Sequence, residues 1–234
     1  MIHQAILKTG RPMVLSLSPG PTSPGLAPEI IPLAQMWRIS DDFWDYWTNT
    51  RHFPRTLHDH FELVAAWAPY ARPGTWPDAD MLPLGYLGPH PGDGEARQSR
   101  LTHSEQQMMM TLWSIARSPL ILGANLTKLD DWTTQLVTNR DILDVDQFGH
   151  NQRQVAREGN TVAWTAEGKG SIRYLALFNL NDKDKTINRT YGFYNLPAGP
   201  YHARELWSQT DRGVSSSINV TLGAHSCMLL ELTP

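Results

Sequence analysis

Apolar residues in the first 150 positions occur in two patterns, short continuous runs and spaced series. Residues 13–18 and 120–123 are nearly continuous apolar runs, which are typical of strands covered on both faces. Residues 36–39 also predict a strand, and residues 57–68 carry apolar side chains at helical spacing. Strands and helices therefore alternate, which predicts a parallel sheet with right-handed helical crossovers.

Start and stop signals predict further helices. Thr102 and Glu105 have the spacing of a capping box, which predicts a helix that ends near Ser118. A turn of helix is also expected in the loop after residue 39. The helices predicted from such signals cover residues 1–10, 29–35, 102–118, 130–136 and 139–144.

Beyond Asp146 the pattern changes to strand-length segments separated by turn residues such as Glu158-Gly159-Asn160. These segments comprise residues 161–165, 172–178, 202–207 and 226–232. We expect an α/β domain over residues 1–150, followed by an antiparallel β sandwich over residues 151–234.

The composition excludes several classes of protein. Of the 234 residues, 41% are hydrophobic and 18% are charged, so the chain can bury a core and is not disordered. The net charge of −3 and the lack of a Lys/Arg cluster argue against a nucleic-acid partner. No apolar run approaches the roughly 20 residues that cross a membrane. The single cysteine, Cys227, excludes an internal disulfide and is expected to be buried.

The densest chemistry lies in residues 36–47, which hold three carboxylates, one guanidinium and three indoles. Strand alternation would direct Arg38 and Asp42 to one face, where Arg38 could bind a polar ligand and the tryptophans could exclude water. In such a place the arginine lowers a carboxyl pKa and desolvation raises it, which suits a group that gives and takes a proton. The alternative is a helix start, with Ser40 as N-cap followed by first-turn acids.

Residues 74–82 form a second informative stretch. Asp78 and Asp80 face the same way on an extended segment, close to Trp76 and Met81. Paired acids at a strand end can bind sugar hydroxyls, hold a metal or serve as acid and base. The alternative is a turn, because Pro-Asp-Ala-Asp is good turn chemistry.

Two further groups have simpler interpretations. His58-Asp59-His60 resembles part of a metal site, but it lacks further nearby ligands and precedes a predicted helix. Surface or capping roles are therefore expected for these three residues. The methionines at positions 108–110 are expected to pack in the core.

The first charged stretch is similar to a motif of a known enzyme family. Trp37-Arg38-x-x-x-Asp42 resembles the acid/base segment of the family 27 glycoside hydrolases, the α-galactosidases and α-N-acetylgalactosaminidases. The resemblance implies that Asp42 is the general acid/base and that Arg38 contacts the sugar. It also implies that Trp37 helps to shape the pocket.

The second stretch is similar to another motif of that family. Trp76-x-Asp78-x-Asp80-Met81-Leu82, preceded by a glycine, resembles the family's late-strand motif. The resemblance implies that Asp80 accepts hydrogen bonds from sugar hydroxyls. Asp78 and Met81 would support that face, and Trp76 would shape the pocket.

The remainder of the chain follows the same family in order. Residues 102–125 resemble a barrel helix and the last barrel strand, and residues 139–147 resemble the segment that closes the barrel. The segments after them resemble the family's C-terminal sandwich. The implied fold is the C-terminal half of a (β/α)8 TIM barrel followed by an antiparallel β sandwich.

The chain departs from the family in lacking the nucleophile. The family's nucleophile is an aspartate on an earlier strand, and the only carboxylate before Asp41 is Glu29. A retaining mechanism needs two carboxyl groups about 5 Å apart. We therefore expect a C-terminal fragment of a longer enzyme, inactive by itself and partnered by the missing N-terminal half of the barrel.

The loop after residue 17 bears on specificity. In the family, an acidic residue and a larger apolar one contact the sugar's 2-position in galactosidases, whereas serine and alanine stand there in N-acetylgalactosaminidases. Ser18 and Pro21 are nearer to the second pair, but proline is neither residue. Galactose, N-acetylgalactosamine and a related pentose all stay open.

The resemblance implies retaining hydrolysis of terminal α-D-galactosides in the complete enzyme, on a galactose-containing oligosaccharide or glycoconjugate. It implies no metal or organic cofactor, and a secreted or periplasmic location. The alternatives are α-N-acetylgalactosaminidase activity and a non-catalytic carbohydrate-binding or partner protein that uses the half-barrel.

Overall fold

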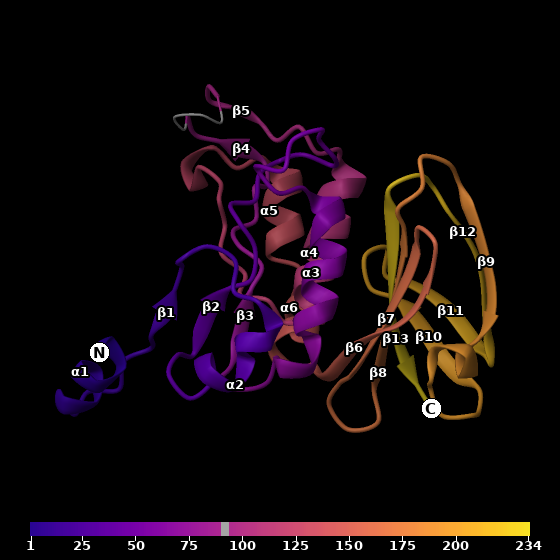
Figure 1. Ribbon diagram of the computed structural model, residues 1–234. Coiled ribbons are helices and arrows are strands. Elements are labelled where there is room, and N and C mark those ends of the chain that lie inside the picture. The colour runs from indigo at the N-terminus through magenta and orange to yellow at the C-terminus, as the bar shows by residue number, and fades with distance from the viewer. Residues whose placement is uncertain (90–93) are drawn as a thin grey trace.

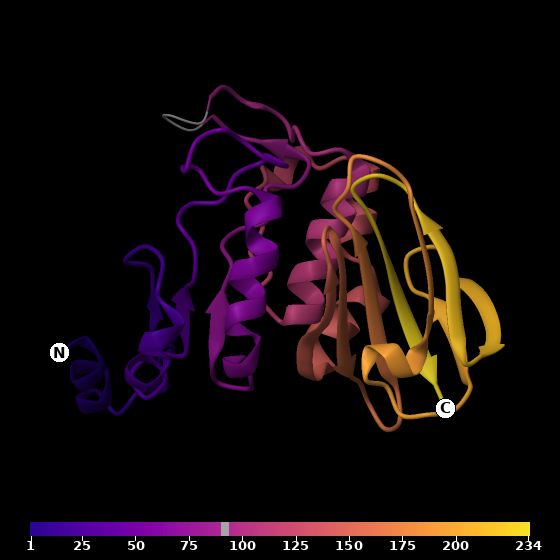
Figure 2. The same cartoon turned by 45° about the vertical axis from the view of Figure 1, so that its right-hand side comes forward.

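The computed structural model describes residues 1–89 and 94–234. It has a helix-rich first part and a β sandwich, which lie side by side (Figure 1). The first part ends with α6 at Phe148, and the first strand of the sandwich begins at His150. The N-terminus lies on the side away from the sandwich (Figure 2).

A small parallel sheet lies at the centre of the first part. It consists of β1 (Ser16–Leu17), β2 (Met36–Arg38) and β3 (Trp76–Asp78), in that order. Both pairings are parallel, as the alternation of strands and helices predicts. The strand predicted over residues 120–123 is wrong in extent, because only a parallel bridge between Leu82 and Leu122 forms there.

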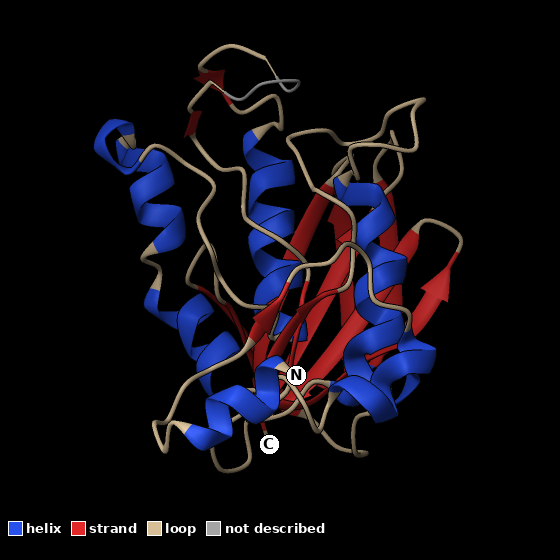
Figure 3. Ribbon diagram, turned by 60° about the vertical axis from the view of Figure 1, so that its left-hand side comes forward, coloured by secondary structure: helices blue, strands red, loops and turns tan. Residues whose placement is uncertain are grey.

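The helices flank the strands, as the blue ribbons on either side of the red arrows show in Figure 3. Apart from the turn of helix expected after residue 39, each predicted helix has a counterpart, although the one predicted over residues 29–35 is displaced toward the N-terminus and the last is longer than expected. No helix of the described residues is long and apolar enough to span a lipid bilayer. The helices are α1 (Ile2–Lys8), α2 (Ala27–Ile30), α3 (Leu57–Trp67), α4 (His103–Ala116), α5 (Asp131–Val137) and α6 (Arg140–Phe148), with 3₁₀ turns η1 (Pro24–Leu26), η2 (Ala68–Tyr70) and η3 (Leu126–Lys128).

The β1 edge is exposed. The prediction of a strand covered on both faces is wrong here, because Val14 is 72% exposed and β1 spans two residues. Within the described residues β1 pairs with β2 alone, so its outer edge carries unpaired backbone groups. The neighbouring α1 has no buried residue and projects from the body (Figure 1).

The sandwich packs against α4. Its six-stranded sheet runs in the order β11-β10-β13-β8-β7-β6, and a two-stranded sheet of β9 and β12 covers the far face. The polar strands β6, β9, β11 and β12 escaped the sequence analysis, whereas the four apolar ones match their predicted segments. The strands are β6 (His150–Glu158), β7 (Thr161–Glu167), β8 (Arg173–Asn179), β9 (Lys185–Thr190), β10 (Tyr201–Glu205), β11 (Thr210–Ser215), β12 (Ser217–Leu222) and β13 (Ser226–Thr233), with the 3₁₀ turn η4 (Tyr191–Tyr194).

Alternation along β8 joins two hydrophobic cores. Ala176 and Phe178 face the helices and belong to the large core, where Phe178 meets Phe61 of α3 edge-on at 5.1 Å. Leu175 and Leu177 face the opposite way and pack with β9 and β12. Because successive strand residues point to opposite faces, one strand supplies both layers.

Helix α4 is the buried centre of the molecule. Met108, Met109 and Met110 are at most 1% exposed, which confirms their predicted place in the core. The predicted capping box is also confirmed, since the Thr102 hydroxyl accepts from Glu105 N–H and the Glu105 carboxylate accepts from Thr102 N–H. Cys227 contacts this helix at Thr111, and burial raises the pKa of its thiol to about 12.

The Thr102 cap predicts a stability effect. Thr102→Ala should lower the free energy of unfolding by about 1 kcal/mol, because it leaves an N-terminal amide of α4 without its acceptor. The matched control is Thr134→Ala, an exposed threonine whose hydroxyl donates to the carbonyl of Asp130. Urea unfolding of both variants checks this; equal destabilisation would contradict the capping role.

Candidate active site

Three neighbouring strands place polar side chains at one level. Leu17 pairs with Trp37, so the next residues, Ser18 and Arg38, lie at the same level, and Arg38 pairs in turn with Asp78. Ser18 is exposed and immediately follows β1. The carboxyl ends of parallel barrel strands are where active sites are built.

Asp80 is bound to Arg38. Arg38 Nη2 donates to Asp80 Oδ2 at 2.7 Å, and the side chains are 11% and 14% exposed. The same Oδ2 accepts from Phe43 N–H at 2.7 Å, while Oδ1 accepts from Met81 N–H at 2.7 Å. Asp80 has φ of 81°, a left-handed conformation that aspartate tolerates better than bulkier residues do. The turn interpretation of residues 77–80 is therefore compatible with a site here.

Asp78 fixes the backbone of Asp80 through a hydrogen bond. Asp78 Oδ1 accepts from Asp80 N–H at 2.9 Å, and Asp78 is 6% exposed. Burial raises the pKa of Asp78 and the pKa of Asp80, although the hydrogen bonds and Arg38 act in the opposite direction. Opposed influences of this kind are common at functional sites.

Asp42 is accessible. Its carboxylate lies 3.5 Å from Arg38 Nη2, and its side chain is 62% exposed. The expectation that tryptophans wall off this group from water is therefore wrong in this structure. The helix-start alternative is also wrong, as is the predicted turn of helix, because residues 40–55 contain no helix. They form an irregular loop, which we call the acid loop (residues 40–56).

The two tryptophans of the motifs do not meet at the site. Trp37 is fully buried on the helix side of the sheet, where it packs on Trp67 at 5.5 Å, so its predicted pocket position is wrong. Side chains alternate along a strand, so Trp37 must point away from the face that Arg38 occupies. Trp76 lies at the start of β3 beside Arg117, two residues before Asp78.

Met81 closes the far side of the Asp80 turn. Its sulfur occupies the space that a side chain at position 123 would need, and Gly123 has none. A glycine at position 123 is therefore needed for Met81 to adopt this place. Met81 thus packs against Gly123 beside the Asp80 turn.

A buried histidine joins the acid loop to α3, and the sequence analysis missed this role. His60 Nδ1–H donates to the Thr56 carbonyl at 2.8 Å, and Nε2 accepts from the Ser40 hydroxyl at 3.2 Å. The ring stacks on Trp113, whose Nε1–H donates to the carbonyl of Asp80 at 3.0 Å. Burial lowers the pKa of His60 to about 4, so the ring is neutral. Its position four residues after Thr56, facing inward on an amphipathic helix, is the signal that could have revealed it.

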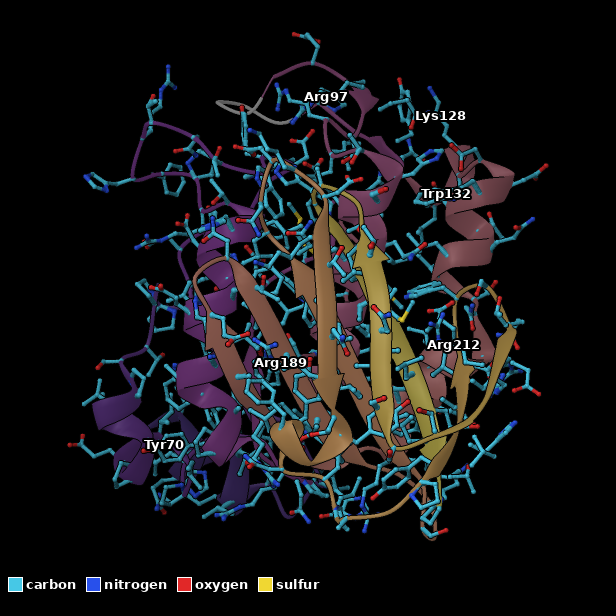
Figure 4. The ribbon with its side chains drawn as sticks, turned by 90° about the vertical axis from the view of Figure 1, so that its right-hand side faces the viewer. Tyr70, Arg97, Lys128, Trp132, Arg189 and Arg212 are labelled. Atoms are coloured by element: carbon cyan, nitrogen blue, oxygen red, sulfur yellow. The ribbon has the colours of Figure 1, made fainter. Side chains whose placement is uncertain are left out.

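A fully buried carboxylate anchors the middle of the acid loop. Asp45 accepts from Arg97 through both oxygens, at 2.6 and 3.1 Å, and from Arg100 at 3.0 Å. The Arg100 N–H adds a fourth bond at 2.8 Å. Arg97 belongs to β5 (Arg97–Gln98), which pairs with β4 (Tyr86–Leu87), and it lies at one end of the molecule (Figure 4). The third carboxylate of residues 36–47 is therefore structural.

The sandwich also touches the acid loop. The ring of His225 stacks on Trp47 at 4.0 Å, and its two nitrogens each lie 2.8 Å from a carboxylate oxygen, of Glu105 and Asp182. His225 sits in the turn before β13 and has φ of 47°. The sequence signal was weak, because a lone turn histidine has no characteristic spacing.

The described residues contain no group of three or more His, Cys, Asp or Glu side chains arranged to hold a metal ion. Asp59 belongs to a capping box with Thr56, so the predicted capping role is confirmed for that residue. The surface role is wrong for His60, which is fully buried. The side chains that meet at the strand ends are the carboxylates of Asp42 and Asp80 and the guanidinium of Arg38.

Comparison with known proteins identifies the family. Residues 1–148 match the family model described as alpha galactosidase A, and residues 158–232 match the alpha galactosidase C-terminal beta sandwich domain. The chain belongs to glycoside hydrolase family 27. This confirms the family that the motifs indicate.

Individual relatives agree with this assignment. The chain is 26% identical to alpha-galactosidase 2 of Arabidopsis thaliana, over 99% of this chain and 54% of the relative. Among solved structures, a GH27 β-L-arabinopyranosidase from Geobacillus stearothermophilus is 40% identical, with a TM-score of 0.92 over 100% of this chain and 52% of that one. A putative α-N-acetylgalactosaminidase from Bacillus halodurans is 37% identical, with a TM-score of 0.80 over 100% of this chain and 52% of that one. The chain spans about half the length of the curated relatives it matches.

The buried His60 predicts a pH dependence of stability. Its pKa is about 4 in the fold against 6.5 for an ordinary exposed histidine, so the unfolded chain binds the proton more tightly between these pH values. Stability is therefore fully present above pH 6.5 and falls toward pH 4, by on the order of 3 kcal/mol.

Urea unfolding of the wild type and His60→Gln at pH 7.5 and 4.5 measures this contribution. The loss of stability on acidification should be smaller in His60→Gln, because the titrating ring is gone. His52→Gln, at an exposed position of the acid loop, should lose as much stability between pH 7.5 and 4.5 as the wild type does. The same loss in all three proteins would contradict the assignment.

Proposed function

We propose that the chain carries the acid/base half of a retaining glycosidase active site, with Asp42 as general acid/base. One contrast carries the proposal. Arg38 Nη2 holds Asp80 at 2.7 Å, whereas Asp42 lies 3.5 Å from the same nitrogen and is 62% exposed. A firmly held carboxylate suits ligand binding, and an accessible one suits proton exchange with a substrate.

Asp42 would act twice in the reaction. In the first step its carboxyl group donates a proton to the glycosidic oxygen as the bond to the sugar breaks and a carboxylate nucleophile attacks the anomeric carbon. In the second step the Asp42 carboxylate takes a proton from the water that releases the sugar, which restores the starting enzyme. The proton returned in the second step balances the one given in the first.

Arg38 and Asp80 would hold the sugar hydroxyls. Arg38 Nη1 makes no hydrogen bond to a described residue, so it remains available as a donor. The Asp80 carboxylate accepts three hydrogen bonds in the fold, and a carboxylate has about four acceptor positions. Asp78 and Met81 would support this pair, whereas Trp76 would line the barrel interior at a lower level.

The proposed substrate is a terminal α-D-galactoside or its pentose counterpart, a β-L-arabinopyranoside. These two sugars share the configuration of their ring carbons and differ in the CH₂OH group. Relatives named for each of them match the chain, and the Geobacillus enzyme has also been solved in complex with arabinose. An α-N-acetylgalactosaminide is the second candidate, because Ser18 is small, exposed and level with Arg38.

The nucleophile would come from the part of the relatives' length that this chain does not span. Among the described residues near Asp42, Asp45 binds two arginines, Asp80 binds Arg38, and Asp41 lies 3.4 Å from Arg55. Each of these carboxylates already has a partner.

We also propose residues 1–150 and 151–234 as the two domains, supported by the end of α6 at Phe148 and the start of β6 at His150.

The purified 234-residue chain is expected to show no turnover of nitrophenyl galactosides or arabinosides. A retaining mechanism needs a second carboxyl group about 5 Å from the first. The carboxylates of Asp41, Asp45 and Asp80 are each paired with an arginine, which leaves none of them free to act as the nucleophile. Release of nitrophenol by the isolated chain, above a heat-denatured control, would refute this expectation.

The role of Asp42 can be tested in a chimaera in which this chain replaces the matching half of the Geobacillus enzyme. Asp42→Ala should slow hydrolysis of an alkyl galactoside or arabinoside by about 10²–10⁴-fold, because its leaving oxygen needs a proton. For a nitrophenyl glycoside the rate of the first step should fall much less, because nitrophenolate is a stable leaving group that departs without receiving a proton.

The matched control is Asp41→Ala, which removes the neighbouring carboxylate and should leave the rates nearly unchanged. Azide should restore activity to Asp42→Ala by attacking the glycosyl-enzyme without needing a general base. Equal losses on both leaving groups, without rescue, would contradict the acid/base role. Comparing galactoside, arabinoside and N-acetylgalactosaminide rates in the active chimaera decides the sugar.

A further inference from the structure

A polar cavity lies beside η2, away from the proposed active site. Its volume is about 470 Å³, within the range of small-molecule sites. Figure 4 places Tyr70 of η2 and Arg97, which anchors the acid loop, at opposite ends of the molecule. The cavity is lined by Ala68, Pro69, Ala71, Arg72, Pro73, Arg117, His150, Asn151, Gln152 and Arg153.

Arg117 is the buried charge of this cavity. It is 8% exposed, follows α4 in a left-handed conformation, and lies over the ring of Trp76 at 4.9 Å. Its Nε–H donates to the carbonyl of Asp146 at 2.9 Å, but its terminal nitrogens make no hydrogen bond to a described residue. A buried guanidinium with unused donors normally has an anionic or polar acceptor.

Two exposed arginines line the same cavity. Arg72 and Arg153 have no side-chain hydrogen bond or ion pair with any residue in the described ranges. The pairing of β6 with β7 shifts register between His150 and Arg153, which marks a bulge. Bulges redirect side chains, and here four consecutive residues, 150–153, line the cavity wall. Gln152 Nε2 donates to the Ala71 carbonyl at 2.7 Å and so fixes the loop that carries Arg72.

No carboxylate lines the cavity among the described residues. Two acids lie close to residues of the lining. Glu167 lies 3.6 Å from His150 Nε2, and Asp146 lines a different cavity together with Arg117 and Trp76. Arg117 is attracted to the nearby Asp146, but Arg72 and Arg153 have no counter-charge among the described residues. Two guanidinium groups at this cavity are therefore available to an anion.

We propose that this cavity binds a small oxyanion of the phosphate class, either free phosphate or the phosphate of a phosphorylated sugar. Guanidinium groups match a phosphate through paired N–H donors. The volume exceeds that of phosphate alone and leaves room for a pyranose ring. The site is independent of the proposed glycosidase function, because it shares no residue with the acid loop.

The test is calorimetric titration of the full chain with inorganic phosphate and with glucose 6-phosphate, in chloride buffers of equal ionic strength. Arg72→Ser combined with Arg153→Ser should weaken binding about tenfold or more, because it removes two charge-assisted contacts. The matched control is Arg11→Ser combined with Arg51→Ser, which removes the same charge from exposed positions elsewhere.

Saturable binding to the wild type and the control, lost in the cavity variant, supports the site. Tighter binding of glucose 6-phosphate than of phosphate, with no binding of glucose, assigns it to a phosphorylated sugar. Equal affinities assign it to free phosphate. Absence of saturable binding by either probe, or unchanged affinity in the cavity variant, would overturn the proposal.

Discussion

The bond between Arg38 and Asp80 is the interaction on which the candidate site depends. It joins the ends of β2 and β3 at 2.7 Å with both side chains largely shielded from water. Removing one partner of such a pair typically costs about 3–5 kcal/mol, because the other charge remains buried. Through Phe43 N–H, Asp80 also sets where the acid loop leaves the strand, and so where Asp42 stands.

The sandwich contributes to this geometry as well as to stability. Its six-stranded sheet packs against α4, and α4 supplies Trp113, which holds the Asp80 carbonyl and stacks on His60. Its His225 stacks on Trp47 of the acid loop. The acid loop, which has no regular structure, is therefore held from β2, from α3, from the Asp45 cluster and from the sandwich. These side-chain contacts act together with backbone hydrogen bonds, such as the one from Arg55 N–H to the Asp42 carbonyl at 2.8 Å.

Several sequence predictions failed for identifiable reasons. Ser40-Asp41-Asp42 has good helix-capping chemistry, but the hydroxyl of Ser40 is taken by His60 and the chain stays irregular. Trp37 was expected at the pocket although it precedes Arg38 directly, and strand alternation sends it to the opposite face. Strands β9, β11 and β12 were missed because their residues are mostly polar and solvent-facing, which leaves little apolar pattern to detect.

The sequence alone determined what depends on local spacing: the parallel strands, the amphipathic helices, the two capping residues of α4 and the motifs around Asp42 and Asp80. It also determined the family, because residue order preserves those motifs. Only the tertiary structure decided that Arg38 binds Asp80 more closely than Asp42, that Asp45 is structural, and that His60 and His225 hold the acid loop. Apart from Arg38 and Asp42, which are four positions apart, these partners are separated by 20 to about 180 positions along the chain, and periodicity carries no information over such distances.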